Sequence, residues 1–273
     1  MNADAAQPLL ALERVDKIFG GLHAVKAVSL AVERGTIFGL IGPNGAGKTT
    51  LFNVITGVYT PEAGRVLFQG ENVAGLGPSA IAGRGIARTF QNIRLFRAMT
   101  VEENVMVAGH KLHKSGLVSA VLRTASHLED ERALRSRARE LLGRLGLEKY
   151  GSHVAGSLPY GSQRRLEIAR ALMLAPELLL LDEPAAGMNS SEARELERQI
   201  RVLRDELGVT IVLVEHNMSV VMSVCERIHV VDHGETIAEG APAEVREHPR
   251  VLAAYLGQEV DESAAGEKAG AAP

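Results

Sequence analysis

The sequence predicts an α/β fold with a mixed sheet at its core, an antiparallel β part beside it and a helical part. Three observations predict this class. The apolar stretch 36–41 leads through a glycine-rich loop into a helix, as a buried parallel strand should. A second apolar stretch, 177–181, ends in two carboxylates. Short alternating stretches near the N-terminus are typical of antiparallel strands.

The glycine-rich loop runs from Gly42 to Thr49 and fits the spacing G-x-x-x-x-G-K-[ST]. Glycines let backbone N–H groups wrap around phosphates, and the N-terminus of the following helix adds a positive dipole. The Lys48 ammonium can reach the β- and γ-phosphates of a nucleotide, and the Thr49 hydroxyl can bind Mg²⁺. The alternative is a turn that matches by accident, and the strand and helix on either side argue against it. The residues expected to bind the nucleotide here are Gly42, Pro43, Asn44, Gly45, Ala46, Gly47, Lys48, Thr49 and Thr50.

Length and composition limit the class of protein. The 273 residues carry a formal net charge of −3 and no Trp, which gives no sign of a nucleic-acid binder or of a polybasic membrane anchor. The single cysteine, Cys225, excludes an internal disulfide, and its apolar neighbours predict a buried thiol in a reducing compartment. We expect neither a signal peptide at residues 1–10 nor a transmembrane segment, so that work at a membrane requires a partner.

Most of the remaining chain fits short strands and amphipathic helices. Alternation and apolar runs predict strands over residues 8–15, 24–32, 65–68, 86–91, 177–181, 209–214, 227–231 and 236–238. Helical periodicity and capping signals predict helices over residues 49–57, 78–83, 100–107, 128–145, 162–175, 190–207, 217–225, 242–247 and 251–256. Turns are expected at 17–21, which carries Phe19, and at 70–72.

We expect one domain over residues 1–257, with a helical subdomain inserted at about 92–165. The stretch 109–126 is ambiguous. His110, His113 and the following His127 lack the spacing of a metal site, so we treat them as surface residues. The tail 258–273 consists mainly of Ala, Gly, Glu and Lys, and we expect it to be disordered.

The carboxylates after the strand 177–181 are candidates for chemistry. An apolar strand that ends in a carboxylate is how enzymes with this loop place a second magnesium ligand, and Asp182 takes that role. Glu183 follows at the exit of the strand, where it could polarise water against the γ-phosphate. Two acids that merely cap a strand are the alternative, and the phosphate-binding loop favours the functional interpretation.

The order of these motifs resembles the ATP-binding subunit of an ABC transporter over almost the whole chain before the tail. After the loop come Gln91, the stretch 158–163 that opens a helix, Asp182 with Glu183, and His216. More narrowly, the sequence is similar to the longer, LivG-type ATPase of branched-chain amino-acid importers. The stretches that carry this similarity are 19–25, 88–91, 94–97 with 99–100, 160–170, 182–187 and 253–257.

The resemblance implies a P-loop fold of the ABC ATPase type that uses ATP and Mg²⁺. Phe19 would stack on adenine, although a lone Phe is more often part of a core. Gln91 would touch Mg²⁺ or the attacking water, and otherwise it is a polar strand end. His216 would contact the γ-phosphate, and otherwise it is a capped histidine at a strand end. Glu183, His216, Gln91 and Lys48 are the expected catalytic residues, and Thr49, Gln91 and Asp182 the expected metal ligands.

A second part of the implied site contacts the ATP of another subunit, so the active unit is expected to be a homo- or heterodimer with two ATPs at its interface. The residues concerned are Leu158, Pro159, Tyr160, Gly161, Ser162, Gln163 and Asn189. This signature departs from the family, which usually has Ser, Gly and Gln where Pro159, Tyr160 and Ser162 stand. Asn189 stands where the family usually has Asp.

The implied protein works at the cytoplasmic face of the membrane, bound to permease subunits that indirectly serve a periplasmic or extracellular solute-binding protein. An importer of urea or other amides is an alternative with similar motifs. A lipopolysaccharide-type exporter is another, against which residues 160–162 argue. A soluble ABC ATPase of DNA repair or translation is a third alternative. Such proteins usually carry two ATPase units or a long coiled-coil insert, and neither is found in this sequence. A small-molecule phosphotransferase would not need the stretch 158–163 or His216.

Overall fold

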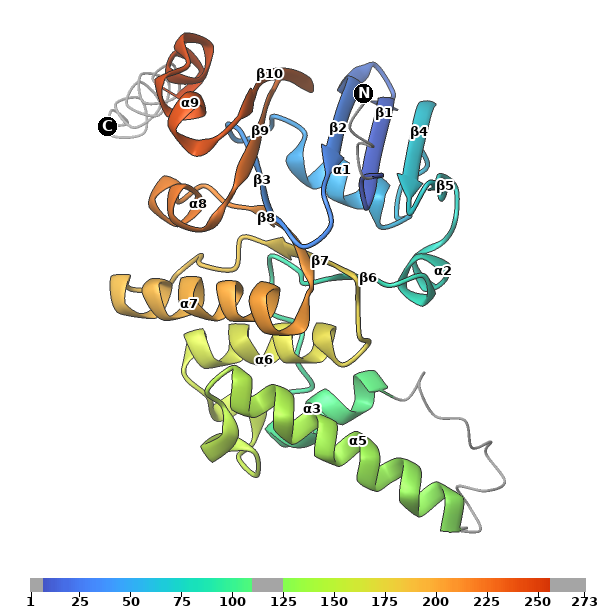
Figure 1. Cartoon of the computed structure of the whole chain (residues 1–273), viewed down its shortest axis with the longest axis vertical. Coiled ribbons are helices and arrows are strands. Elements are labelled where there is room, and N and C mark those ends of the chain that lie inside the picture. Colours follow the sequence, from blue (N-terminus) through green and yellow to red (C-terminus); the bar gives the residue numbers. More distant parts are fainter. Residues whose placement is uncertain (1–6, 110–124, 256–273) are drawn as a thin grey trace, which may run out of the picture. The chain divides into compact units, whose positions relative to one another are not determined.

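The computed structural model describes residues 7–109 and 125–255 (Figure 1), and the expected disordered tail, His110 and His113 lie outside these ranges. The chain divides into two compact units. One comprises residues up to 81 and those from 210 onward, and the other comprises residues 82–209. None of the helices in the described ranges combines the length and hydropathy of a membrane span.

The first unit contains an antiparallel sheet with the strand order β2-β1-β4-β5 (Figure 1). Its strands are β1 (Leu10–Phe19), β2 (Leu22–Val32), β4 (Ala63–Phe68) and β5 (Glu71–Asn72). The turn predicted at 17–21 is wrong for its first three residues, because β1 continues to Phe19, which pairs with Leu22. The predicted turn at 70–72 likewise contains the short strand β5, which pairs with β4.

The same unit holds the strand that precedes the phosphate-binding loop. β3 (Ile37–Ile41) lies parallel to both β8 (Thr210–Val214) and β9 (Arg227–Asp232), and β10 (Glu235–Gly240) pairs antiparallel with β9. Every residue of β3 and β8 is buried, which explains their uninterrupted apolar sequences. The helices of this unit are α1 (Lys48–Ile55), α8 (Met218–Val224) and α9 (Pro242–Glu247), and residues 249–255 are also helical. Helix α2 (Pro78–Gly83) contains the division between the two units, after residue 81.

The second unit pairs two parallel strands, β6 (Ile86–Arg88) and β7 (Leu178–Asp182). Its helices are α3 (Val101–Ala108), α5 (Ala125–Arg144), α6 (Tyr160–Leu172) and α7 (Ser190–Leu207), with short 3₁₀ turns at Glu148–Tyr150 and Ala155–Ser157. The predicted capping box of α3 is confirmed, because Thr100 Oγ1 accepts from Glu103 N–H and Glu103 Oε2 accepts from Thr100 N–H. The boundary of the expected insert at 92–165 stays a prediction.

Most element boundaries in this unit differ from the sequence prediction by one to three residues, and two of the differences bear on the site. The strand expected over 86–91 ends at Arg88. Beyond it, the carbonyl oxygens of Phe90 and Gln91 accept hydrogen bonds from the Arg164 side chain rather than from a neighbouring strand. Helix α6 begins at Tyr160, two residues before the expected start, because Pro159 adopts the extended conformation of an N-cap.

Candidate functional site

The glycine-rich loop joins β3 to α1, as predicted, and its glycines are required by the backbone around them. Gly42 has φ +155°, and a Cβ placed on it would lie 2.0 Å from the carbonyl oxygen of Val231. Gly47 has φ +102°, and its Cβ would lie 2.6 Å from the carbonyl oxygen of Ala24. Both clashes are with backbone atoms, which cannot rotate away. The loop therefore keeps a shape that only glycine permits at these two positions.

Lys48 lies inside this loop. Its side chain is buried, and its ammonium group donates to the carbonyl oxygens of Gly42 at 2.6 Å and Pro43 at 2.8 Å. Helix α1 starts directly after Gly47, with no side-chain cap and no acidic residue in its first turn. The first N–H groups of a helix lack intrahelical partners and carry the positive end of its dipole. A buried cation and such a helix start fit the phosphates of a nucleotide.

Two further predicted residues lie in the unit that carries the loop. Phe19, at the end of β1, is 38% exposed and therefore is not a core residue. Its ring meets Tyr59 edge to face at 5.1 Å, and the Lys17 ammonium lies 5.1 Å from its centroid. An exposed aromatic face held in this way can stack on a planar base. His216 is exposed and follows the buried Glu215 at the end of β8.

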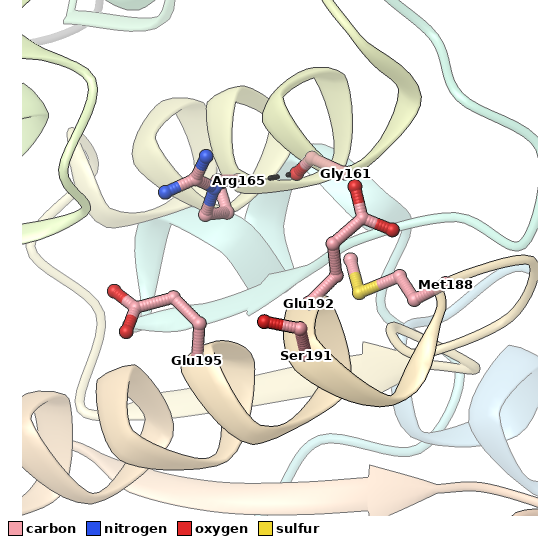
Figure 2. A pocket seen from close by; sticks show the side chains of 6 residues that line it. All are labelled: Gly161, Arg165, Met188, Ser191, Glu192 and Glu195. Carbon is pink, nitrogen blue, oxygen red and sulfur yellow. Dashed lines mark hydrogen bonds between the residues drawn. The ribbon is translucent and has the colours of Figure 1, made fainter.

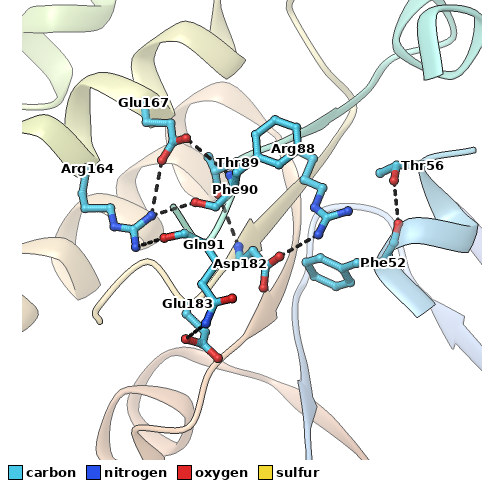
Figure 3. Close-up of polar contacts among 10 residues, drawn as sticks. All are labelled: Phe52, Thr56, Arg88, Thr89, Phe90, Gln91, Arg164, Glu167, Asp182 and Glu183. Atoms are coloured by element: carbon cyan, nitrogen blue, oxygen red, sulfur yellow. Dashed lines mark hydrogen bonds and ion pairs between the residues drawn. The ribbon is translucent and has the colours of Figure 1, made fainter. Parts of the chain in front are cut away.

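The second unit brings three predicted residues together at the ends of β6 and β7 (Figure 3). Asp182 is the last residue of β7 and is buried. Glu183 follows with φ +48°, an uncommon conformation for a residue other than glycine. Gln91 donates from Nε2 to Glu183 Oε2 at 2.9 Å. Such backbone conformations concentrate at functional sites, where the surrounding structure holds them.

Arg88, the last residue of β6, contacts this cluster and was not predicted from the sequence. Its Nη2 donates to Asp182 Oδ2 at 2.7 Å, and both side chains are more than nine-tenths buried (Figure 3). The next residue, the buried Thr89, accepts a hydrogen bond from the Asp182 N–H at 3.3 Å. The only sequence signal for this pair was the position of Arg88 in the stretch 88–91, three residues before Gln91.

The stretch 158–163 leads into helix α6, and its residues play different parts. The Leu158 side chain is buried. Gln163 donates from Nε2 to the Leu158 carbonyl oxygen at 2.8 Å, so these two residues contact each other within the stretch. Pro159 and Tyr160 are exposed. Tyr160 lies over Gly187, since a Cβ on that glycine would come within 3.1 Å of the Tyr160 ring.

A pocket of about 210 Å³ lies between the starts of α6 and α7 (Figure 2). It is lined by Gly161, Arg165, Met188, Ser191, Glu192 and Glu195. The carboxylate of Glu192 closes against Gly161, where a Cβ would lie only 2.9 Å from Glu192 Oε1. Gly161 therefore gives room for the acidic end of a neighbouring helix at the first turn of α6.

Asn189 has a structural task that we did not predict. Its side-chain oxygen accepts from the N–H groups of Ser191 and Glu192, and Glu192 Oε2 in turn accepts from the Asn189 N–H at 3.1 Å. These bonds form a capping box at the start of α7. The signal was present in the sequence, because an N-cap residue is followed three positions later by Glu.

Each unit carries oxygen donors of a type that fits a magnesium ion. In the second unit Asp182 offers a carboxylate and Gln91 an amide oxygen, and in the first unit Thr49 offers a hydroxyl, all ligand types that Mg²⁺ prefers. Within residues 7–109 and 125–255, no cluster of three or more His, Cys, Asp or Glu side chains could form a metal site by itself. Mg²⁺ in nucleotide sites is usually held by one or two carboxylates together with substrate phosphates, so a complete protein cage is not needed.

The fold and these motifs define a nucleotide-binding cassette. A family model described as ABC transporter matches residues 25–186, and one described as branched-chain amino acid ATP-binding cassette transporter matches residues 235–261. The chain belongs to the ATP-binding proteins of the ABC transporter family and is an ATPase. This confirms the fold class and the family expected from the sequence.

Within the family, the chain is similar to proteins named for branched-chain amino-acid transport. It is 47% identical over 253 residues to the high-affinity branched-chain amino acid transport ATP-binding protein LivG of Salmonella typhimurium, covering 93% of this chain and 99% of the relative. It is 43% identical to BraF of Pseudomonas aeruginosa over the same shares of the two chains. The lipopolysaccharide export ATP-binding protein LptB of Escherichia coli is 36% identical, covering 92% and 98%.

Solved structures give the same fold. The crystal structure of an ATP-binding cassette of an ABC transporter in its ADP conformation has a TM-score of 0.81 and 31% identity, covering 92% of this chain and 100% of that chain. A dimeric structure of a bacterial ABC transporter cassette has a TM-score of 0.72 and 27% identity, covering 85% and 98%.

Proposed function

We propose that this chain is the Mg²⁺-dependent ATPase subunit of an importer for branched-chain or related amino acids. The observation that carries the substrate class is the 47% identity to LivG across nearly the whole of both chains. The match of residues 235–261 to a model specific for branched-chain transporters supports it independently, because that segment lies outside the general ATPase match.

The binding half of the proposal concerns ATP itself. The loop 42–50 binds the phosphates through its backbone N–H groups, and Lys48 reaches the β- and γ-phosphates. Phe19 stacks on the adenine. Bound Mg²⁺ would neutralise charge that develops on the phosphate oxygens, and Thr49, Gln91 and Asp182 are the residues that would hold it.

The hydrolytic half concerns residues that act on water. Glu183 accepts a proton from the attacking water, and Gln91, which is hydrogen-bonded to it, orients that water. His216 contacts the γ-phosphate. Arg88 holds the Asp182 carboxylate in place through their ion pair. The start of α6, with Gly161, presents N–H groups to the ATP of a second subunit.

The partners follow from this assignment. A second ATPase subunit completes each ATP site, and two permease subunits carry the solute across the membrane at whose cytoplasmic face this chain is bound. The helical insert after Gln91, up to about Gly146, is the proposed docking surface for the permease. Within it, the exposed ring of Phe96 lies against Arg170, and just before it the exposed ring of Phe90 lies against Arg94. Lipopolysaccharide export is the second candidate, and the lower identity of 36% to LptB ranks it behind amino-acid import.

ATP hydrolysis by the proposed residues is tested with Glu183→Gln and Lys48→Ala. Glu183→Gln keeps the side-chain shape but removes the base, so we expect ATP to bind and to trap a dimer that size-exclusion chromatography with Mg-ATP detects. Lys48→Ala removes a phosphate contact, so we expect weak ATP binding and no trapped dimer. Normal turnover by Glu183→Gln would refute its assignment as the base.

The substrate is tested with the complete transporter. The chain is reconstituted in vesicles with candidate permease subunits, and ATPase activity is measured with binding protein loaded with leucine, isoleucine, valine or urea. We expect stimulation by the branched-chain amino acids. Stimulation by urea alone, or by lipopolysaccharide, would assign the chain to one of the alternative systems.

A further inference from the structure

The segment 88–94 connects the catalytic carboxylates to helix α6 within one unit (Figure 3). On one side, Arg88 pairs with Asp182 and the Gln91 side chain donates to Glu183. These contacts use side chains of the segment. Its backbone faces a different partner, helix α6, whose first turn carries the signature residues.

Two charged side chains of α6 hold that backbone. Arg164 donates from Nη1 to the Phe90 carbonyl oxygen at 2.7 Å and from Nη2 to the Gln91 carbonyl oxygen. Glu167 Oε1 accepts from the N–H groups of Phe90 and Arg94, each at a longer 3.4 Å. The two residues also face one another, with Arg164 Nη1 3.4 Å from Glu167 Oε2.

Both side chains are almost inaccessible, with 3% of Arg164 and 5% of Glu167 exposed. Burial raises the pKa of the Glu167 carboxyl, and the Arg164 charge beside it opposes that shift. Buried charges are tolerated only while their partners stay in place. The planar guanidinium fork suits two consecutive carbonyl oxygens, whereas a lysine ammonium offers one compact point of charge. This arrangement therefore fixes the 88–94 backbone more firmly than neutral side chains would.

We propose that Arg164 and Glu167 are positioning residues that couple helix α6 to catalysis, by holding the backbone from which Gln91 reaches Glu183. The proposal rests on the proposed roles of Gln91 and Glu183. A displacement of α6, such as contact with the nucleotide of a second subunit would cause, is transmitted through the Arg164 fork to Gln91. A change in the position of α6 thereby changes the position of Gln91 relative to Glu183, through hydrogen bonds inside one subunit.

The kinetic test is a double-mutant cycle between Arg164→Lys and Gln91→Ala, in the full chain with Mg-ATP. In the wild-type background we expect Arg164→Lys to lower kcat roughly tenfold with little change in KM, because a misplacement of about 1 Å can cost about 100-fold in rate. In the Gln91→Ala background we expect Arg164→Lys to have almost no further effect. A purely structural role of Arg164 would lower kcat by the same factor in both backgrounds, which would overturn the proposal.

The matched control is Arg144→Lys, the same substitution at an arginine of α5 that forms ion pairs with Glu140 and Glu206 rather than with the segment 88–94. It should leave kcat unchanged. If Arg164→Lys fails to fold, Glu167→Gln replaces it, because this change keeps the side-chain shape and removes the charge that faces Arg164.

Hydrogen exchange provides a readout that does not depend on activity. Peptides covering residues 88–95 should exchange roughly tenfold faster or more in Arg164→Lys, since hydrogen bonds to charged groups contribute measurably to local stability. Arg144→Lys should not change them. Unchanged exchange in Arg164→Lys overturns the proposal. If Gln91→Ala alone leaves kcat unchanged, the proposed role of Gln91 is wrong and so is the coupling to catalysis, whereas the exchange result still shows whether α6 holds the segment.

Discussion

Replacement of Arg88 by Met tests how strongly the buried pair with Asp182 holds the end of β7. The two side chains are 9% and 4% exposed, and their atoms Nη2 and Oδ2 lie 2.7 Å apart. Removal of one partner leaves the other as a buried charge, which costs about 3–5 kcal/mol in comparable pairs. Native proteins have about 5–15 kcal/mol of stability in total. Arg88→Met should therefore remove a large part of the free energy of unfolding.

The assay is urea unfolding at pH 8 without nucleotide, followed by circular dichroism. With a slope of about 3 kcal/mol per molar urea, the midpoint should fall by about 1 M or more. The double variant Arg88→Met/Asp182→Asn leaves neither charge, and it should recover much of the loss. The control is Arg198→Met, which breaks an exposed pair with Glu195 and should cost at most about 1 kcal/mol. The reasoning fails if Arg88→Met is no more destabilising than Arg198→Met, or if Asp182→Asn does not restore stability.

Three further predictions concern other parts of the chain. Burial raises the pKa of the Cys225 thiol to about 12, so native protein at pH 8 should resist iodoacetamide while urea-unfolded protein reacts, as mass spectrometry will show. The hydrogen bond from His229 lowers the pKa of the Glu239 carboxyl from 4.5, so this residue stabilises the fold above about pH 4.5 and loses that effect as pH falls through the lowered pKa. Glu239→Gln should lower the melting temperature at pH 7 and flatten its decline in acid. Asn189→Ala should cost about 0.5–2 kcal/mol through loss of the α7 cap, and Asn189→Asp should retain it in thermal unfolding.

Elements with a strong local signal were predicted well from the sequence. The apolar runs of β3 and β8, the glycine loop and the capping box at Thr100 lie where the pattern placed them. Each of these features depends on residues that lie close together in the sequence, so its physical cause can be read from a short stretch of the chain. Asp182 and Glu183 could be placed at the end of β7 for the same reason.

The errors arose where distant residues decide the structure. Just after β6 ends at Arg88, the carbonyl oxygens of Phe90 and Gln91 accept hydrogen bonds from Arg164, which lies 74 residues beyond Phe90 along the chain. The pair of Arg88 with Asp182 also joins residues from two separate strands, and the sequence near either residue does not indicate which residue it pairs with. The capping role of Asn189 is different, because its sequence signal is local: Glu192 follows it three positions later.

The burial of Lys48 has a consequence for the energetics of nucleotide binding. Because the ammonium group already lies among the carbonyl oxygens of Gly42 and Pro43, it has lost most of its water before any phosphate arrives. The dehydration penalty is thus part of the folding equilibrium rather than of the binding equilibrium. Arrival of a phosphate then exchanges one set of oxygen partners for another, at little entropic expense for a side chain that is already confined. The burial of Lys48 therefore lowers the stability of the nucleotide-free protein, and the ammonium group needs no reorganisation when the nucleotide binds.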